Sequence, residues 1–110
     1  MYVQVDLRTP AATSVELQEA DDFRAFKLVV LSPDGHPDGL EDALRDVGSI
    51  GPDGDVFLRI DAVRRLAGGT AEDPAWTTAF DQMIDYARSR GWVAGDATLR
   101  AHQELRQGPV

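Results

Sequence analysis

The residues best suited to acid–base chemistry lie near the end of the chain. Arg100, His102 and Glu104 alternate along the sequence, so on a β-strand their side chains share one face. There, His102 and Glu104 are candidates for an acid–base pair, and the Arg100 guanidinium is suited to orient a carboxylate. Trp92 is a candidate wall for a ligand pocket. The residue types alone favour the alternative of an exposed or interface histidine, with Trp92 contacting only the preceding helix.

A second group of potential ligands lies in the loop Asp34-Gly35-His36-Pro37-Asp38-Gly39. Asp34 and Asp38 flank His36, a donor set that suits a hard or borderline cation. Asp-Gly and Pro-Asp-Gly are also ordinary turn sequences, and Asp38 is placed to cap a helix. We therefore prefer the turn interpretation and expect no metal or other cofactor.

Other functional motifs fail on spacing or are missing. Asp53-Gly54-Asp55 begins like a calcium loop, but its twelfth position is Arg64 instead of glutamate. Arg64-Arg65 precedes Gly68-Gly69 at a predicted helix C-terminus, where carbonyl dipoles repel anions. The sequence has no phosphate-binding glycine loop, nucleophile elbow or zinc-protease motif. The lack of cysteine excludes disulfides, thiolate metal sites and a cysteine nucleophile.

The composition of the 110 residues is that of an acidic globular protein. Nineteen acidic residues against eleven Lys and Arg give a net charge of -8, which argues against binding to nucleic acid. The longest apolar run, Leu28–Leu31, is far shorter than the roughly 20 residues of a membrane span, and the N-terminus lacks a signal-peptide pattern. We therefore expect a cytoplasmic protein of one domain, residues 1–110, without membrane contact. Ten arginines against one lysine are typical of a GC-rich bacterial genome.

The first third of the chain predicts three strands. Val3, Val5 and Leu7 alternate with polar residues, and so do Val15 and Leu17 after a turn-like segment. These two strands are predicted to form a hairpin. The segment from Phe23 to Leu31 carries apolar residues on both faces, which predicts a central strand.

Two short helices and a strand are predicted in the middle. Asp38 with Glu41 has capping-box spacing and predicts a helix that ends at Gly48. The apolar stripe of that helix is Leu40, Ala43, Leu44 and Val47. A fourth strand follows over 56–60, and Asp61 is predicted to cap a two-turn helix that ends at Gly68-Gly69.

The most strongly indicated helix runs from Pro74 to Arg90. Asp73 is its predicted N-cap, and proline suits the first helical position. Gly91 is predicted to end it in a Schellman motif, with Trp92 folding back onto the last turn. The segment 96–105 alternates in polarity and is predicted as a strand, with a helix as the alternative.

Together these elements predict the order β-β-β-α-β-α-α-β. This order indicates an α+β fold with a mostly antiparallel sheet of four to five strands and helices packed mainly on one face. The other face of the sheet is then left open.

Three functions are compatible with this fold. The first is a non-catalytic protein-interaction module that forms a homodimer through the open sheet face. The second is a small cofactor-independent enzyme or small-molecule-binding protein with a cleft near His102. Its fold-level analogy is with small ferredoxin-like oxygenases and cyclases, which begin β-α-β, whereas three strands come first here. The third is an acidic inhibitor or immunity-type protein for a basic partner.

Overall fold

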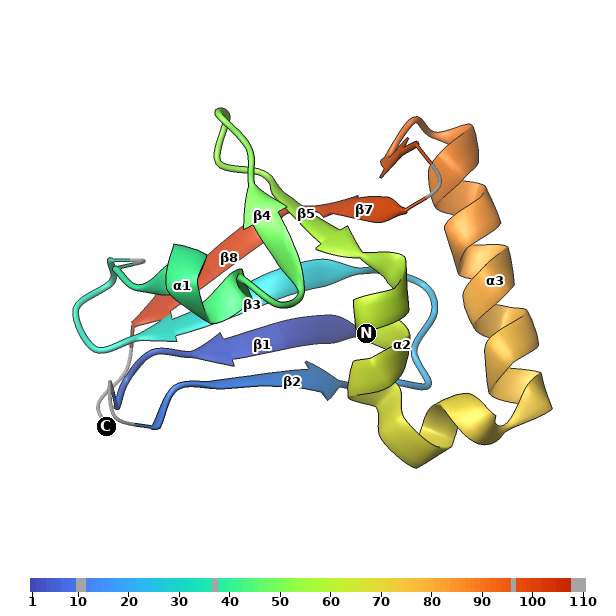
Figure 1. The fold of residues 1–110 in the computed structure, drawn as a ribbon, viewed down its shortest axis with the longest axis horizontal. Helices are drawn as coiled ribbons and strands as arrows, with labels where there is room; N and C mark the ends of the chain where they lie inside the picture. Colours follow the sequence, from blue (N-terminus) through green and yellow to red (C-terminus); the bar gives the residue numbers. More distant parts are fainter. Residues whose placement is uncertain (10–11, 37, 96, 108–110) are drawn as a thin grey trace.

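The computed structural model describes residues 1–9, 12–36, 38–95 and 97–107. The strands are β1 (Tyr2–Asp6), β2 (Ser14–Gln18), β3 (Lys27–Ser32), β4 (Gly48–Ile50), β5 (Val56–Arg59), β6 (Val93–Ala94), β7 (Thr98–Ala101) and β8 (Gln103–Gln107). The helices are α1 (Leu40–Leu44), α2 (Ile60–Ala67) and α3 (Pro74–Ser89), and a 3-10 helix, η2 (Gly68–Glu72), joins α2 to α3. The predicted α+β class is confirmed (Figure 1). The element order also agrees, with β4, β6 and β8 as additional strands.

Four strands form a mixed sheet in the order β2-β1-β3-β8. β1 and β2 pair antiparallel as the predicted hairpin, while β3 pairs parallel with β1 on one side and with β8 on the other. The predicted central position of β3 is therefore confirmed. Its apolar residues on both faces fit this position, because Val29 is fully buried on the face opposite to Leu28 and Val30.

The remaining strands form a second, antiparallel sheet in the order β4-β5-β7-β6. The sequence predicted one sheet of four to five strands, and the structure has two sheets of four. The difference arises at His102, where the chain leaves β7 of the antiparallel sheet and enters β8 of the mixed sheet. The predicted strand over 96–105 is thus two strands, and Asp96 lies outside the described residues.

A single cluster of buried side chains joins both sheets to the helices. The mixed sheet contributes Val3, Val5, Leu28 and Val30, the antiparallel sheet contributes residues such as Leu58 and Leu99, and the helices contribute residues such as Leu44, Val63 and Phe80. Figure 1 shows α1 and α2 in front of the mixed sheet and α3 beside its end. No helix among the described residues is long and apolar enough to span a membrane.

Both ends of α3 form as predicted. The Asp73 carboxylate accepts a hydrogen bond of 2.9 Å from the backbone N–H of Ala75, and Pro74 occupies the first turn. At the other end Gly91 has a φ of 79°, and the Trp92 N–H donates to the Ala87 carbonyl over 2.9 Å. This hydrogen bond is the defining contact of a Schellman motif.

The predicted caps of the two shorter helices are wrong. α1 begins after Gly39, whose φ of 88° is left-handed, and no side chain caps it. The chain therefore enters α1 through a conformation that glycine adopts most easily, instead of through an extended Asp38. α2 follows β5 directly, so Arg59 is its N-cap and Asp61 lies in the first turn. Gly48, predicted as a helix end, instead begins β4.

Candidate functional site

A groove opens between the C-terminal end of α3 and the segment that leads into β3. Its lining residues are Arg24, Ala25, Phe26, Tyr86, Trp92, Arg100 and His102, and its volume is about 340 Å³. A smaller extension of about 70 Å³ reaches inward to side chains that include Met83 and Leu99. We call the first the Trp92 groove and the second its inner extension. The structure thus brings together three residues that the sequence singled out: Trp92, Arg100 and His102.

The first wall of the groove is built by the end of α3. The Schellman motif carries Trp92 back onto the last turn, where its ring meets the Tyr86 ring edge-on, with 6.0 Å between centroids and 76° between planes. The Arg90 guanidinium lies 5.6 Å from the centroid of the Trp92 ring. Trp92 is 38% exposed, so an incoming ligand can reach it.

The second wall is built by β7. The Arg100 N–H donates to the Trp92 carbonyl over 2.7 Å, which places the two residues side by side. The Leu28 N–H donates to the His102 carbonyl over 2.9 Å. The first hydrogen bond links β7 to the residue that follows the end of α3, and the second links His102, between β7 and β8, to the start of β3. The backbone of Arg100 and of His102 is therefore fixed by hydrogen bonds, and this positions their side chains in the lining.

Asp55 lies behind the two basic side chains. It directly precedes Val56, which pairs with Ala101, so Asp55 comes opposite His102 across the antiparallel sheet. The Arg100 Nε donates to Asp55 Oδ2 over 2.7 Å, and His102 Nδ1 lies 3.6 Å from Asp55 Oδ1. The exposed fraction of the side chain is 19% for Asp55, 45% for Arg100 and 88% for His102. The Asp55 carboxylate thus contacts the Arg100 and His102 side chains from the protein side, and both side chains extend toward solvent.

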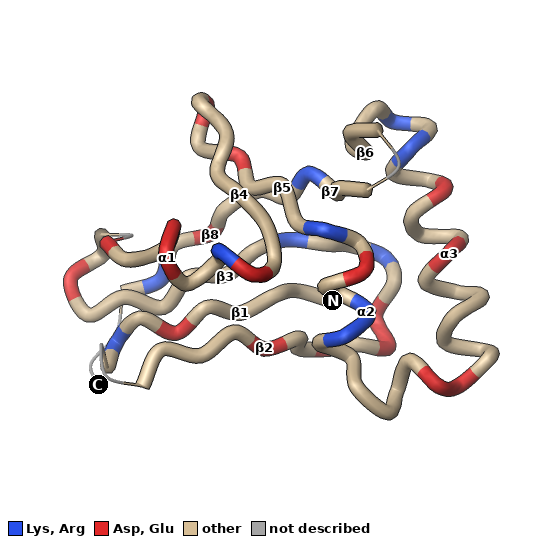
Figure 2. Tube along the Cα trace, in the orientation of Figure 1, with Lys and Arg blue, Asp and Glu red and all other residues tan. Residues whose placement is uncertain are grey.

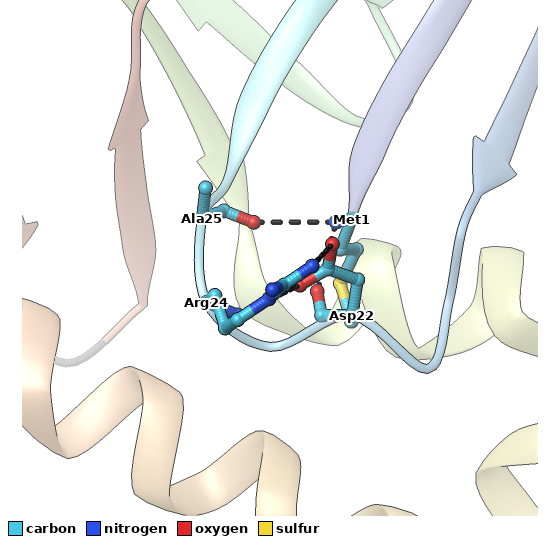
Figure 3. Close-up of polar contacts among 4 residues, drawn as sticks. All are labelled: Met1, Asp22, Arg24 and Ala25. Carbon is cyan, nitrogen blue, oxygen red and sulfur yellow. Dashed lines mark hydrogen bonds and ion pairs between the residues drawn. The ribbon is translucent and has the colours of Figure 1, made fainter.

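The third wall is the loop between β2 and β3. Figure 3 shows the amino group of Met1 donating to the carbonyls of Asp22, at 2.8 Å, and of Ala25, at 3.3 Å. The Arg24 guanidinium makes two contacts of 3.1 Å with the Asp22 carboxylate and lowers the pKa of that carboxyl far below its ordinary value. These contacts fix the position of the loop where Arg24 and Ala25 line the groove.

The charge of the groove contrasts with that of the whole chain. Arg24, Arg100 and His102 line it, and none of its described lining residues is acidic. Other surface hollows are acidic. Their carboxylates are Asp38 and Asp42 beside α1, Glu41 and Asp42 between α1 and β4, and Glu19, Asp21 and Asp22 beside the β2–β3 loop. In a chain with a net charge of -8, the described lining of the groove therefore combines basic side chains with aromatic walls, and the carboxylates that pair with Arg24 and Arg100 lie outside the lining.

Glu104 does not join His102. It lies on β8, where it accepts a hydrogen bond of 3.2 Å from Lys27 Nζ and one of 2.7 Å from Arg106 Nε. Lys27 and Arg106 lower the pKa of the Glu104 carboxyl. The predicted pairing requires one continuous strand, and the change of sheet at His102 separates the two side chains. Asp55 takes the place expected for Glu104 beside His102.

In the candidate metal loop, of which Pro37 lies outside the described residues, Asp34 makes local hydrogen bonds. The Asp34 carboxylate accepts hydrogen bonds from the Ser32 hydroxyl at 2.8 Å and from the His36 backbone N–H at 3.0 Å. These neutral donors lower the pKa of the Asp34 carboxyl. The part of the chain that the structure describes contains no group of three His, Asp or Glu side chains arranged to hold a metal ion.

Sequence reasoning missed Asp55, Tyr86, Phe26 and Arg24 as parts of this site. A signal existed for Tyr86, because it precedes Trp92 by six residues, and a Schellman motif brings these two positions into contact. No local signal connects Asp55 with Arg100, which is 45 residues away in the sequence. That contact depends on the pairing of β5 with β7.

Comparison of the chain with protein-family models, with curated proteins and with solved structures finds no match.

Proposed function

We propose that this protein binds a small organic ligand in the Trp92 groove. One observation carries the proposal: Tyr86, Trp92 and Phe26 form aromatic walls beside the basic side chains of Arg100 and His102, in a groove with no acidic side chain among its described lining residues. Small-molecule sites are characteristically apolar clefts with a few convergent polar groups. This arrangement favours the small-molecule hypothesis over the protein-interaction hypothesis.

The size of the groove supports the same function. Its volume of about 340 Å³ is at the lower end of the roughly 300–1,000 Å³ typical of ligand pockets. An aromatic ring of the ligand can pack against Trp92 and Tyr86, in the offset or edge-on geometry that such rings prefer. Arg100 and His102 then supply the polar contacts that orient the ligand.

The outer face of the mixed sheet gives less support to a homodimer. Its charged side chains pair laterally, with Lys27 against Glu104 at 3.2 Å and Arg8 against Asp6 at 2.9 Å, as expected for a face in contact with water. Dimerisation through this face stays a prediction, as does a cytoplasmic location. Light scattering of the purified protein tests the dimer, and a monomer would contradict it.

The inhibitor hypothesis requires a one-sided cluster of acidic residues. Figure 2 shows acidic positions on α1, along α3, and in the loops at both ends of the molecule. This distribution over the described chain does not define a surface for a basic partner, so the inhibitor hypothesis gains no support from it.

NMR screening with a library of neutral, cationic and anionic aromatic fragments tests the proposed function. Binding in the groove should shift the indole N–H signal of Trp92, whereas Trp76 is an internal control. The Trp76 ring is buried, and its Nε1 donates to the Ala20 carbonyl over 2.8 Å. The proposal fails if no fragment shifts the Trp92 signal, or if the shifts concentrate on the acidic hollow beside α1.

Two arginine variants identify the groove as the binding site. Arg100→Gln should weaken binding of the anionic fragment hits about tenfold, because it removes the guanidinium that faces the ligand. Arg65→Gln is the matched control, since Arg65 is an exposed residue of α2 and does not line the groove. Equal affinity loss in both variants would show a general effect of net charge and would contradict the assignment.

A further inference from the structure

The strand β8 leaves one edge of the mixed sheet without a partner. β8 is last in the strand order and pairs with β3 on one side, and no strand among the described residues pairs with its other side. Figure 1 shows β8 at the border of the mixed sheet, on the side away from β2. The second half of the strand, residues 105–107, is exposed. Such an edge presents unpaired backbone N–H and C=O groups, which can pair with another strand.

The backbone of β8 determines which residues face the open edge. The Leu28 N–H donates to the His102 carbonyl over 2.9 Å, so this carbonyl points toward β3. Along a strand, the backbone groups of successive residues point to opposite sides. The residues that present their N–H and C=O groups to the open edge are therefore Gln103, Leu105 and Gln107.

The sequence of β8, Gln-Glu-Leu-Arg-Gln, is complementary to itself. Antiparallel pairing of two copies over the full strand sets Leu105 opposite Leu105. Glu104 then faces Arg106 of the second copy, and Gln103 faces Gln107. In this register the residues that exchange backbone hydrogen bonds are the three whose backbone groups point outward, so the register agrees with the backbone direction.

The charged side chains of β8 favour the same register. Within one strand, Arg106 Nε donates to Glu104 Oε2 over 2.7 Å. When two strands pair about Leu105, the two ion pairs lie side by side on one face with alternating signs. Each carboxylate then has a guanidinium along its own strand and another across the pair, and opposite charges at directly opposed positions stabilise an antiparallel pair. Charged residues often protect an edge strand from pairing, whereas these two attract a second copy of the strand.

The other strand edges do not share this property. β2 also has five residues, but full antiparallel pairing with its own copy sets Glu16 opposite Glu16, which brings like charges together. The edge strands of the antiparallel sheet, β4 and β6, have only three and two residues. Among the described strands, β8 therefore provides the edge best suited to pair with itself.

From these observations we infer that the protein forms a homodimer in which two β8 strands pair antiparallel about a two-fold axis at Leu105. The two mixed sheets then continue as one eight-stranded sheet. The Leu105 side chain, which is 38% exposed in one copy, meets its equivalent across the axis. This interface is the edge of the mixed sheet, in contrast to the outer face considered above, and it is independent of ligand binding in the Trp92 groove.

Sedimentation velocity of the full chain at protein concentrations from about 5 to about 500 µM tests the dimer. We expect a shift from monomer to dimer over this range, because one pair of edge strands forms a small interface. A monomer at every concentration would leave the edge to another occupant and would overturn the inference. Assembly beyond the dimer would also overturn it, since a two-fold pair uses up the β8 edge of both copies.

Two lysine variants locate the interface. Leu105→Lys should raise the dissociation constant of the dimer about tenfold, because two ammonium groups then face each other at the axis and the apolar contact is lost. Ile50→Lys is the matched control, since Ile50 is 37% exposed and lies on β4, an edge strand of the other sheet. It should leave the dissociation constant unchanged. An unchanged dimer in Leu105→Lys, or an equal loss in Ile50→Lys, would refute the β8 interface.

Two charge-reversal variants test the register. Glu104→Arg leaves two positive charges on β8, and Arg106→Glu leaves two negative charges. Each variant alone should dimerise about tenfold more weakly than the unmodified protein, because like charges then face each other at both positions.

An equimolar mixture of the two variants should restore the dimer, because each position of a mixed pair again faces the opposite charge. Both variants keep the strongly negative net charge of the chain, so a general attraction between them does not explain a mixed dimer. Sedimentation velocity of each variant and of the mixture measures the effect. A mixture that associates no better than the separate variants, or a single variant that dimerises as tightly as the unmodified protein, would overturn the proposed pairing. This comparison decides the question even if Leu105→Lys does not fold.

Discussion

The Trp92 groove and the hollow beside α1 have almost the same volume, about 340 and 350 Å³, but very different linings. The described lining of the hollow is Leu7, Thr13, Asp38, Gly39, Asp42 and Ala43, which includes two carboxylates and no aromatic ring. The groove has aromatic walls and basic side chains. Volume alone therefore does not distinguish a candidate site in this molecule, whereas the chemistry of the lining does.

The two regions also differ in how firmly their walls are held. The groove is framed by α3, a helix of 16 residues with a side-chain cap at its start and a Schellman motif at its end. The hollow borders α1, which has five residues and no side-chain cap. Binding sites need side chains held by well-packed elements, so the frame of α3 is a second reason to place the ligand there.

The largest effect is expected from glycines with positive φ in the two regions. Gly91, at the end of α3, has a φ of 79°, and Gly39, before α1, has a φ of 88°. Alanine at either position should lower the free energy of unfolding by roughly 1–2 kcal/mol, because a Cβ disfavours the left-handed conformation. Urea unfolding measures both losses.

Only Gly91→Ala should also weaken the binding of the aromatic fragment hits, since Gly91 sets the position of Trp92. NMR titration of the folded variants separates the two positions. Similar affinity losses for Gly39→Ala would mean that the affinity follows overall stability instead of the placement of Trp92.

A smaller effect is expected at the helix caps. Asp73→Ala removes the acceptor for the Ala75 N–H and should cost about 1 kcal/mol of unfolding free energy. Asp38→Ala should cost less than about 0.5 kcal/mol, because Asp38 is exposed and no side chain caps α1. Urea unfolding of the two variants tests the pair. A cost at Asp38 as large as that at Asp73 would show that α1 depends on a cap after all.

The smallest effect concerns two carboxylates with lowered pKa values, Asp22 beside the groove and Asp34 near α1. A carboxyl group that is more acidic in the folded state stabilises the fold above its ordinary pKa of 3.8. This contribution is lost as the pH falls through the folded-state pKa. Asp22→Asn and Asp34→Asn should therefore lower the free energy of unfolding at neutral pH. The loss relative to the unmodified protein should become smaller as the pH is lowered.

Salt should separate these two variants. Asp22 is held by the charged Arg24, whereas Asp34 is held by the neutral Ser32 hydroxyl and the His36 N–H. About 1 M salt should reduce the effect of Asp22→Asn and leave that of Asp34→Asn nearly unchanged. Urea unfolding with and without salt measures both, and equal salt dependence would contradict these assigned causes.

The sequence alone determined the elements whose causes lie close together in the chain. Asp73, Pro74 and Gly91 predicted both ends of α3, and Trp92 was correctly predicted to fold back onto its last turn. Alternating polarity predicted the β1–β2 hairpin and the central position of β3. These predictions succeed because capping, turn formation and amphipathic periodicity depend on residues only a few positions apart.

Only the tertiary structure decided which charged side chains meet. The alternation of Arg100, His102 and Glu104 was correct as a local pattern, but the chain changes sheets at His102, so Glu104 pairs with Lys27 and Asp55 pairs with Arg100. These partners are 77 and 45 residues apart in the sequence. Strand pairing and the packing of the two sheets bring them together, and neither is encoded in local spacing. The residue types near the end of the chain were visible in the sequence, whereas the groove they line exists only in the folded protein.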